Sequence, residues 1–349
     1  MLSTGLHHRR AEDDLSALKS QLLRVSNAVS QALEHAVDGV VRFDRVRLNE
    51  VMVGDYAINR AVRALDDSAH AFVALHQPAA TSLRTVSSVL RLSIALERIG
   101  DYAVTLSRAG LHLRSQPGSD VLETIAALGG HGVRMLNLST RAFVDADEDL
   151  AMRTMPMARD IHRLHNDFFQ RLTREEGTLS LADRVRWLTI AGRLERVGDQ
   201  GSGICKETVF ACSGRKAPVP VRRVLFVDRA DGLLARIAEA HAARWPGAQI
   251  QATSASIDPQ PQAHPLLGDI PGVQVGQNEP RAAEDLRTYD VIVALEPGVD
   301  AQLGGIPFHC ILLDWAIDRD VSDVENLSTE LRQRVDALCT MLTGQELMR

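Results

Sequence analysis

The heptapeptide ALERIGD at residues 95–101 returns later in the chain as RLERVGD at residues 193–199. Five of the six positions in the shared LER(I/V)GD motif are identical. Self-similarity of this kind is typical of a structural unit that occurs twice in one chain. The motif therefore predicts that the part of the chain around it consists of two related units.

Helical periodicity surrounds both copies of the motif. Apolar residues recur at a spacing of three and four in six segments. These segments are 15–35, 51–74, 83–113, 122–143, 148–172 and 180–212. Breaks are expected around residues 38–44, at Gln77-Pro78 and at residues 115–119. Long helices joined by short loops indicate an all-α N-terminal half, residues 1–213, made of two antiparallel three-helix bundles at about 12–114 and 119–213.

The composition changes after residue 213. The stretch GRKAPVP at residues 214–220 is typical of a linker. Buried-strand patterns follow at residues 221–227, 249–255, 289–295 and 308–313, with helical patterns at 233–245 and 321–342. Strands that alternate with helices predict an α/β domain with a four-stranded parallel sheet over residues 221–349.

Each copy of the motif places two carboxylates on one face of a helix. Glu97 and Asp101, like Glu195 and Asp199, are four residues apart, and like charges at this spacing repel unless a cation offsets them. The first pair continues a 3–4 spacing of apolar residues, so we expect it to be at least half-buried and to need a partner. The apolar residues in this stripe are Leu83, Val86, Leu90, Ile94 and Val104.

Two kinds of partner fit these acids. Carboxylate oxygens suit iron, manganese, zinc or magnesium, and carboxylates on facing helices build metal sites in bundles. Ion pairs with Arg98, Arg196 or arginines of neighbouring helices are the alternative.

His162 and His165 lie one turn apart near Asp160, where we expect a solvated helix face, with metal ligation as the alternative.

The repeated E-x-x-x-D motif resembles that of the PhoU family, and the resemblance covers nearly all of residues 12–213. VGDYAIN at residues 53–59 looks like the second-helix motif of that family, and Gln77-Pro78 introduces the third helix as it does there. In the second repeat, Arg159-Asp160-Ile161 takes the place of Asp55 and its neighbours. The chain departs from the family in having Ser82-Leu83-Arg84 after the Gln-Pro pair, and in lacking that pair in the second repeat.

The resemblance implies a function and a set of metal ligands. It implies multinuclear iron, zinc or manganese sites at Asp55, Glu97 and Asp101, and at Asp160, Glu195 and Asp199. It also implies regulation of phosphate uptake through contact with the ATPase of a phosphate ABC transporter, with a phosphate-sensing histidine kinase, or with both.

The C-terminal half resembles the low-molecular-weight tyrosine phosphatases and related arsenate reductases. In that family a C-x5-R loop after the first strand carries the nucleophile and the phosphate clamp. Here aspartate and leucine occupy those two positions, so the loop is degenerate; its residues of interest are Asp228, Arg229, Asp231, Gly232 and Leu234. A thiolate nucleophile and a bidentate arginine are both missing. We therefore expect a pseudo-phosphatase domain that holds a partner or forms a homodimer, with a phosphatase or arsenate reductase as the disfavoured alternative.

Charge and composition exclude other classes of protein. The net charge of -6 and pI near 6.1 argue against a nucleic-acid partner. No apolar run approaches the roughly 18 residues of a membrane span, and the N-terminus lacks the pattern of a secretory signal, so we expect a cytoplasmic protein without direct membrane insertion. A ferritin-like oxidase would need Glu-x-x-His, which does not occur in the sequence. A plain coiled-coil scaffold would leave the repeated acids unexplained.

Overall fold

The computed structural model describes residues 2–174, 179–215, 221–230, 232–245, 249–258, 285–307, 309–317 and 324–344. The chain divides into two compact units, Met1–Ala217 and Pro218–Arg349. Most of the expected linker at 214–220 lies outside the described residues.

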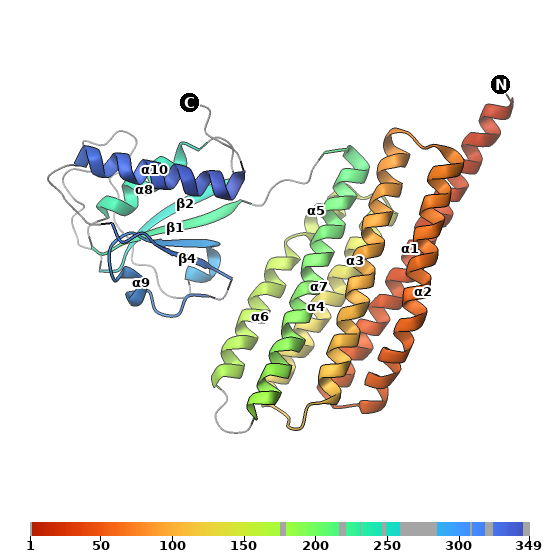
Figure 1. The fold of residues 1–349 in the computed structure, drawn as a ribbon, viewed down its shortest axis with the longest axis horizontal. Helices are drawn as coiled ribbons and strands as arrows, with labels where there is room; N and C mark the ends of the chain where they lie inside the picture. The colour runs from red at the N-terminus through yellow and green to blue at the C-terminus, as the bar shows by residue number, and fades with distance from the viewer. Residues whose placement is uncertain are drawn as a thin grey trace. The chain divides into compact units, whose positions relative to one another are not determined.

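Long helices build the first unit (Figure 1). They are α1 (Leu2–Arg42), α2 (Arg45–His76), α3 (Ala80–Leu111), α4 (Ser119–Val144), α5 (Glu148–Thr154), α6 (Met157–Arg174) and α7 (Leu181–Ser213). The expected breaks are confirmed. Asp44 caps α2 by accepting hydrogen bonds from the backbone N–H groups of Val46 and Arg47, and Gln77 ends that helix in a left-handed conformation just before Pro78.

The helices pack as two bundles that share one core. In the first bundle α1, α2 and α3 contact one another, and in the second α4, α6 and α7 do so. Contacts between α3 and α7 and between α1 and α4 join the bundles. One continuous cluster of buried apolar side chains runs through both, including Leu33, Leu96 and Trp187. The expected pair of antiparallel three-helix bundles is therefore confirmed.

One expected helix is two helices. The periodicity predicts a single helix over 148–172, but α5 ends at Thr154 and α6 begins at Met157. Pro156 lies between them and has no N–H to donate, so it interrupts the hydrogen bonding of a continuous helix. The prediction was wrong because the apolar spacing continues in phase across the break.

A parallel sheet forms the core of the second unit. Its strands are β1 (Arg222–Asp228), β2 (Ile250–Ser256), β3 (Val291–Ala294) and β4 (Ile311–Asp314), in the order β2-β1-β3-β4 and all parallel. Val224 and Phe226 of β1 pack against α8 (Leu233–Ala243) and α10 (Val324–Thr343), whereas Leu225 and Val227 face a second apolar cluster. This alternation follows from the two-residue period of a strand. The predicted four-stranded α/β domain is confirmed.

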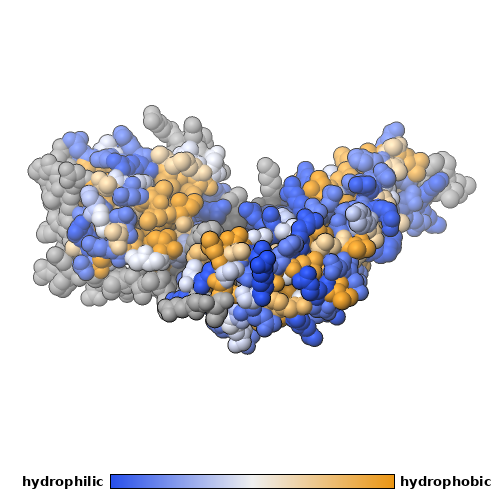
Figure 2. Space-filling view, turned by 60° about the horizontal axis from the view of Figure 1, so that its bottom comes forward, coloured by the Kyte–Doolittle hydropathy of each residue, from blue (hydrophilic) through white to orange (hydrophobic). Residues whose placement is uncertain are grey.

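The surface of the molecule is mixed in character. Figure 2 shows hydrophilic and hydrophobic residues interspersed over the displayed face of the helical unit. Several large apolar side chains of the helical unit are exposed, among them Val53, Tyr56 and Leu75 of α2. Within the described ranges, no helix combines the length and hydrophobicity that crossing a bilayer requires.

Candidate functional site

The acids of the first repeat meet where α2 lies against α3. Asp55 of α2 is close enough to Asp101 of α3 for the two charges to interact. A Cβ atom placed on Gly100 would lie 3.5 Å from Oδ1 of Asp55, which puts that oxygen directly over the glycine. Glu97 lies one turn before Asp101 on α3 and is exposed. The structure thus brings Asp55 and Asp101 together and places Glu97 on the adjoining surface.

The expected apolar stripe is buried only in part: Val86 lies in the core and Leu90 packs against it. Leu83 is 45% exposed and Ile94 is 49% exposed, and Glu97 and Asp101 share their outward face. The buried residues of α3 lie on the other faces, because α1, α2 and α7 all pack against this helix. The prediction of half-buried acids on α3 was wrong for this reason, and the half-buried acid of this group is Asp55 on α2.

Asp55 carries an unsatisfied buried oxygen. Its Oδ2 accepts a hydrogen bond from Nδ2 of Asn59 at 2.8 Å, whereas its Oδ1 is buried without a hydrogen-bond partner. Burial, and then the negative charge of Asp101, raise the pKa of Asp55, which the Asn59 hydrogen bond opposes. A buried carboxylate oxygen without a donor is costly, and a cation would relieve both the desolvation and the repulsion.

The acids of the second repeat already have a partner. Nδ1 of His162 on α6 lies 2.9 Å from Oε1 of Glu195, and its Nε2 lies 3.5 Å from Oδ1 of Asp199. Contacts first with Asp199 and then with Glu195 raise the pKa of His162 to about 9, against the cost of burial. The same imidazole lowers the pKa of both carboxyl groups. The three side chains therefore form a cluster of one cation and two anions, with a net charge of one negative unit.

Asp160 and the two histidines are not placed as expected. The Asp160 carboxylate forms an ion pair with Arg163 on its own helix, and His162 instead occupies the place beside Glu195 and Asp199. His165 is buried, and burial lowers its pKa. The expectation of a solvated face at His162 and His165 was wrong, because α6 turns this face toward α7. Nη1 of Arg196 also lies 3.5 Å from Oδ2 of Asp199.

The donor sets of the two repeats differ in what they can bind. Within the described part of the chain, no three histidine, cysteine or carboxylate side chains are grouped as a ready metal site. The first repeat offers two carboxylates, Asp55 and Asp101, with one oxygen orphaned. These hard oxygen donors fit a divalent or trivalent cation, with Glu97 nearby on the open side for a further ligand. The residues of the first repeat therefore fit the expected metal.

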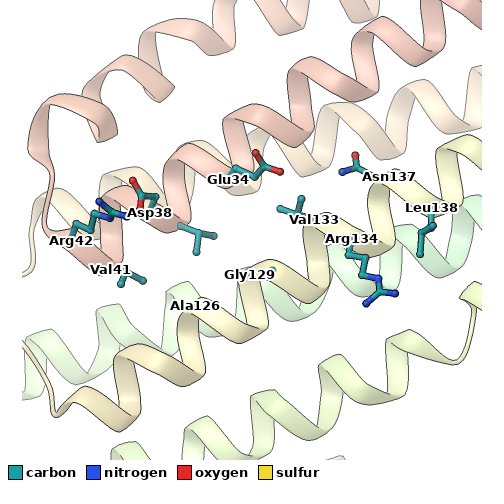
Figure 3. Close-up of a pocket in the computed structure, with 12 residues that line it drawn as sticks. Glu34, Asp38, Val41, Arg42, Ala126, Gly129, Val133, Arg134, Asn137 and Leu138 are labelled. Carbon is teal, nitrogen blue, oxygen red and sulfur yellow. Dashed lines mark ion pairs between the residues drawn. The ribbon is translucent and has the colours of Figure 1, made fainter.

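A hollow of about 690 Å³ lies between α1 and α4 (Figure 3). Its lining combines apolar and charged side chains, and Figure 3 shows Glu34 and Asp38 on α1 on one side and Gly129 and Arg134 on α4 on the other. The helices approach closely here, since a Cβ on Gly129 would lie 2.6 Å from the methyl groups of Val37. This hollow leaves no signal in the sequence, because it depends on which two helices of the repeats are neighbours.

Carboxylates of the chain itself accept the hydrogen bonds around the loop after β1 in the second unit. Asp228 is 1% exposed and accepts hydrogen bonds from Oγ of Ser256 at 2.6 Å and from the backbone N–H of Ala235 at 3.2 Å. The backbone N–H of Arg229 donates to Oε2 of Glu296 at 2.6 Å. The backbone N–H of Ala235 in the first turn of α8 and that of Arg229 in the preceding loop are thus bonded to acids of the chain itself, although such donors could hold an oxyanion.

The remaining loop positions carry no phosphate clamp. Leu234 is 1% exposed and belongs to the apolar core, and Gly232 adopts a left-handed conformation just before α8. Asp231 lies outside the described residues. Glu296 was not predicted from the sequence as part of this site. It follows β3 and therefore reaches the same sheet edge as Asp228. The adjacency of β1 and β3 would have been the signal that the two acids lie close together.

Comparison with known proteins agrees with this architecture of two repeats with paired acids. Residues 22–109 and 125–208 each match the PhoU domain. A phosphate-specific transport system accessory protein PhoU homolog of Thermotoga maritima is 26% identical over 212 residues, 60% of this chain and 91% of that protein. PhoU of Escherichia coli is 26% identical over 204 residues, 58% of this chain and 85% of that protein.

Solved structures agree on the fold of the helical unit. The crystal structure of PhoU from Streptococcus pneumoniae superposes with a TM-score of 0.55 at 22% identity, covering 60% of this chain and 99% of that one. A thioredoxin-dependent arsenate reductase of Corynebacterium glutamicum reaches a TM-score of only 0.33 at 19% identity, covering 53% of this chain and 98% of that one, and this likeness is too weak to assign a fold.

The structure and the matches together define a protein built on a duplicated helical domain that presents paired acids. The helical unit, which carries two copies of the PhoU domain, belongs to the PhoU family.

Proposed function

We propose that this protein is an accessory regulator of phosphate uptake that acts by contact with partner proteins and binds a metal cation in its first repeat. The two PhoU domains carry the regulatory part of the proposal. The orphaned Oδ1 of Asp55 beside Asp101 carries the cation part. Iron, zinc and manganese all accept this donor set.

Contact with partners is supported by the surface next to the acids. Glu97, Asp101 and the exposed apolar side chains Leu83 and Ile94 share one face of α3. A cation held there by few protein ligands keeps coordination positions that a partner can reach. The partners proposed are the ATPase of a phosphate ABC transporter and a phosphate-sensing histidine kinase, which places the protein in the cytoplasm.

The regulatory role predicts the behaviour of a phosphate-starvation reporter. In a strain lacking this protein and grown in ample phosphate, we expect the reporter to be active, and wild-type protein to silence it. A variant carrying Asp55→Asn, Glu97→Gln and Asp101→Asn is expected to fail to silence it, because it lacks the charges that hold the cation. The readout is reporter activity at equal protein level.

Asp67→Asn is the matched control, since Asp67 is an exposed acid elsewhere on α2. It should silence the reporter like the wild type. A reporter that stays silent in the deletion strain would remove the phosphate role. Full silencing by the triple variant would keep the role and remove the acids from it.

The second unit is proposed to bind a partner or a second copy of the chain without catalysing a reaction. Its support is the buried Asp228 in place of a nucleophilic thiolate and the apolar Leu234 in place of an arginine clamp. The inward hydrogen bonds to Asp228 and Glu296 add to it, because they use donors that a phosphate would need.

This proposal predicts that the protein does not hydrolyse p-nitrophenyl phosphate. The rate with the wild-type chain should equal that of the Asp228→Asn variant and of buffer, measured as nitrophenolate release. A wild-type rate well above that of the variant, in protein freed of contaminating phosphatase, would contradict the pseudo-phosphatase assignment and favour an aspartyl nucleophile.

A further inference from the structure

Four helices form the centre of the helical unit, and α2 and α6 fill two of the grooves between them. The four are α1, α3, α7 and α4; each contacts the next, and α4 contacts α1 to close the ring. The helix α2 packs against both α1 and α3, and α6 packs against both α4 and α7. The other two grooves of the ring run between α3 and α7 and between α1 and α4.

Side chains bridge the groove between α3 and α7. Nη1 of Arg91 on α3 lies 3.0 Å from Oε2 of Glu207 on α7, and Oγ of Ser88 donates to the same carboxylate at 3.0 Å. The guanidinium carbon of Arg193 on α7 lies 5.6 Å from the ring centroid of Tyr102 on α3. These contacts pair charged groups across the groove and hold α3 directly against α7.

The groove between α1 and α4 is open over a longer distance. The hollow of Figure 3 continues into a second hollow of about 690 Å³, and Glu34 and Asn137 line both. Along α1 the two hollows extend from Leu23 to Arg42, which is about 28 Å at 1.5 Å per residue. The second hollow is lined mainly by hydroxyl, amide and charged side chains, whereas apolar side chains predominate in the first. A groove of this length matches a helix of about five turns.

One acid and one base face each other at the same level of this groove. The two helices run antiparallel, because the later part of α1 and the earlier part of α4 line the first hollow. A 2.8 Å hydrogen bond between the hydroxyl groups of Ser26 and Thr140 sets their register. Glu34 is eight residues after Ser26 and Arg134 is six residues before Thr140, so their heights differ by only about 3 Å.

These two charges differ from their neighbours in the same hollow. Asp38 and Arg42 form an ion pair with each other on α1, at 2.6 Å. Glu34 and Arg134 are both exposed, and neither forms a hydrogen bond or an ion pair with any described residue. An occupant with a cation on the α1 side and an anion on the α4 side would therefore complement the groove.

We infer that the groove between α1 and α4 is the docking site for one amphipathic α-helix of a partner protein. The occupant is a helix because two other grooves of the same ring each hold one helix and because the length and apolar lining suit one. Its apolar side lies over Val37 and Val133, a basic side chain reaches Glu34, and an acidic side chain reaches Arg134. The inference adds a surface to the proposed regulatory role, on two helices that carry none of the proposed metal ligands.

Two designed peptides of about 18 residues, long enough to cover the groove, test the inference on the full chain. Both place leucines at a spacing of three and four on one face and carry fluorescein. The first has lysine along one edge of that face and glutamate along the other, and the second has glutamate along both. In fluorescence anisotropy, we expect the wild type to bind the first peptide about fivefold more tightly than the second, because the second meets Glu34 with a like charge.

Charge variants show whether the peptides lie between the two walls. Glu34→Arg makes both walls basic, so the order of the two affinities should reverse. Asp67→Arg makes the same change in net charge at an exposed site on α2 and should keep the wild-type order. An order that Glu34→Arg leaves unchanged, or that both variants change alike, would overturn the inference.

Filling the hollow gives a second, independent test. Gly130 lines the first hollow and a Cβ there would meet nothing within 4 Å, so Gly130→Trp should lower the affinity for both peptides about tenfold or more without disturbing the bundle. Gly203→Trp on α7 is the matched control, since a Cβ there also meets nothing within 4 Å, and it should bind both peptides like the wild type. Circular dichroism melting verifies that each variant is folded.

The remaining outcomes all contradict a partner helix. Failure of the wild type to bind either peptide, or unchanged binding by Gly130→Trp, would overturn the inference. A wild type that sediments as a dimer and a Gly130→Trp variant that sediments as a monomer would assign the groove to a second copy of the chain instead. None of these measurements involves phosphate or a metal, so the reporter assay decides the proposed regulatory role separately.

Discussion

Replacing Asp183 with alanine is expected to lower the free energy of unfolding of the helical unit by about 2–4 kcal/mol. Asp183 is 1% exposed in the first turn of α7. Its carboxylate accepts hydrogen bonds from Oγ of Ser115 at 2.8 Å, from the backbone N–H of Arg114 at 3.3 Å, and from Nη1 of Arg186 at 3.0 Å. Two of these donors belong to the loop between the repeats, so alanine leaves them unpaired and frees that loop from α7.

The effect of Asp183 should depend on pH. Burial favours the protonated form, but the hydrogen bonds from Ser115, Arg114 and Arg186 outweigh it and lower the pKa of Asp183 below its usual 3.8. A group with a lowered folded-state pKa stabilises the protein above the unfolded-state pKa and loses this contribution as the pH falls through the folded-state value. The difference between wild type and Asp183→Ala should therefore be full at pH 7 and shrink below about pH 4.

Urea unfolding measures this difference if the helical unit is observed alone. Trp187 is fully buried in α7, one turn from Asp183, and replacing Trp245 and Trp315 with phenylalanine leaves it as the sole fluorescent reporter. Asp67→Ala, at an exposed site on α2, should change stability by less than about 0.5 kcal/mol. An equal, small effect of Asp183→Ala and Asp67→Ala would show that the carboxylate does not hold the loop.

The repeated LER(I/V)GD motif predicted the duplicated bundle correctly, because helical periodicity and internal repetition depend only on local sequence. It could not predict which face of α3 carries the acids. Residues 97 and 101 share a face at any orientation of the helix, but the number of neighbouring helices decides whether that face is buried. Three neighbours around α3 leave Glu97 and Asp101 on its open side.

The partner of the second acid pair was missed for a related reason. Asp160 and His162 are two residues apart and point in different directions from α6, and the family pattern favoured the acid over the histidine. Only the packing of α6 on α7 shows that His162 faces Glu195 and Asp199. Long-range geometry of this kind, like the approach of Glu296 to the loop after β1, depends on tertiary contacts that spacing along the chain does not encode.

Gly129→Ala is expected to destabilise the helical unit by about 1–3 kcal/mol, although alanine is the better helix former. The added Cβ would lie 2.6 Å from both methyl carbons of Val37 and 3.2 Å from its Cβ, at the crossing of α1 and α4. A β-branched side chain in a helix has essentially one allowed rotamer, so Val37 cannot turn away and the helices must separate. This crossing borders the hollow between the bundles.

Gly130 provides the matched control for this prediction. It is the next residue of α4 and lines the same hollow, but a Cβ there would meet nothing within 4 Å. Gly130→Ala should therefore stabilise the helix by up to about 1 kcal/mol, so that adjacent glycines respond with opposite sign. Trp187 fluorescence in urea measures both variants.

A double-mutant cycle identifies the contact responsible. If the clash with Val37 is the cause, Val37→Ala should make Gly129→Ala much less costly, with an interaction energy of about 1 kcal/mol or more. The cavity cost of Val37→Ala alone cancels in the cycle, so it does not obscure the result. Additive effects of the two substitutions would mean that α1 and α4 can move apart here without a large energetic cost. The close approach of Gly129 to Val37 would then not fix the distance between the bundles.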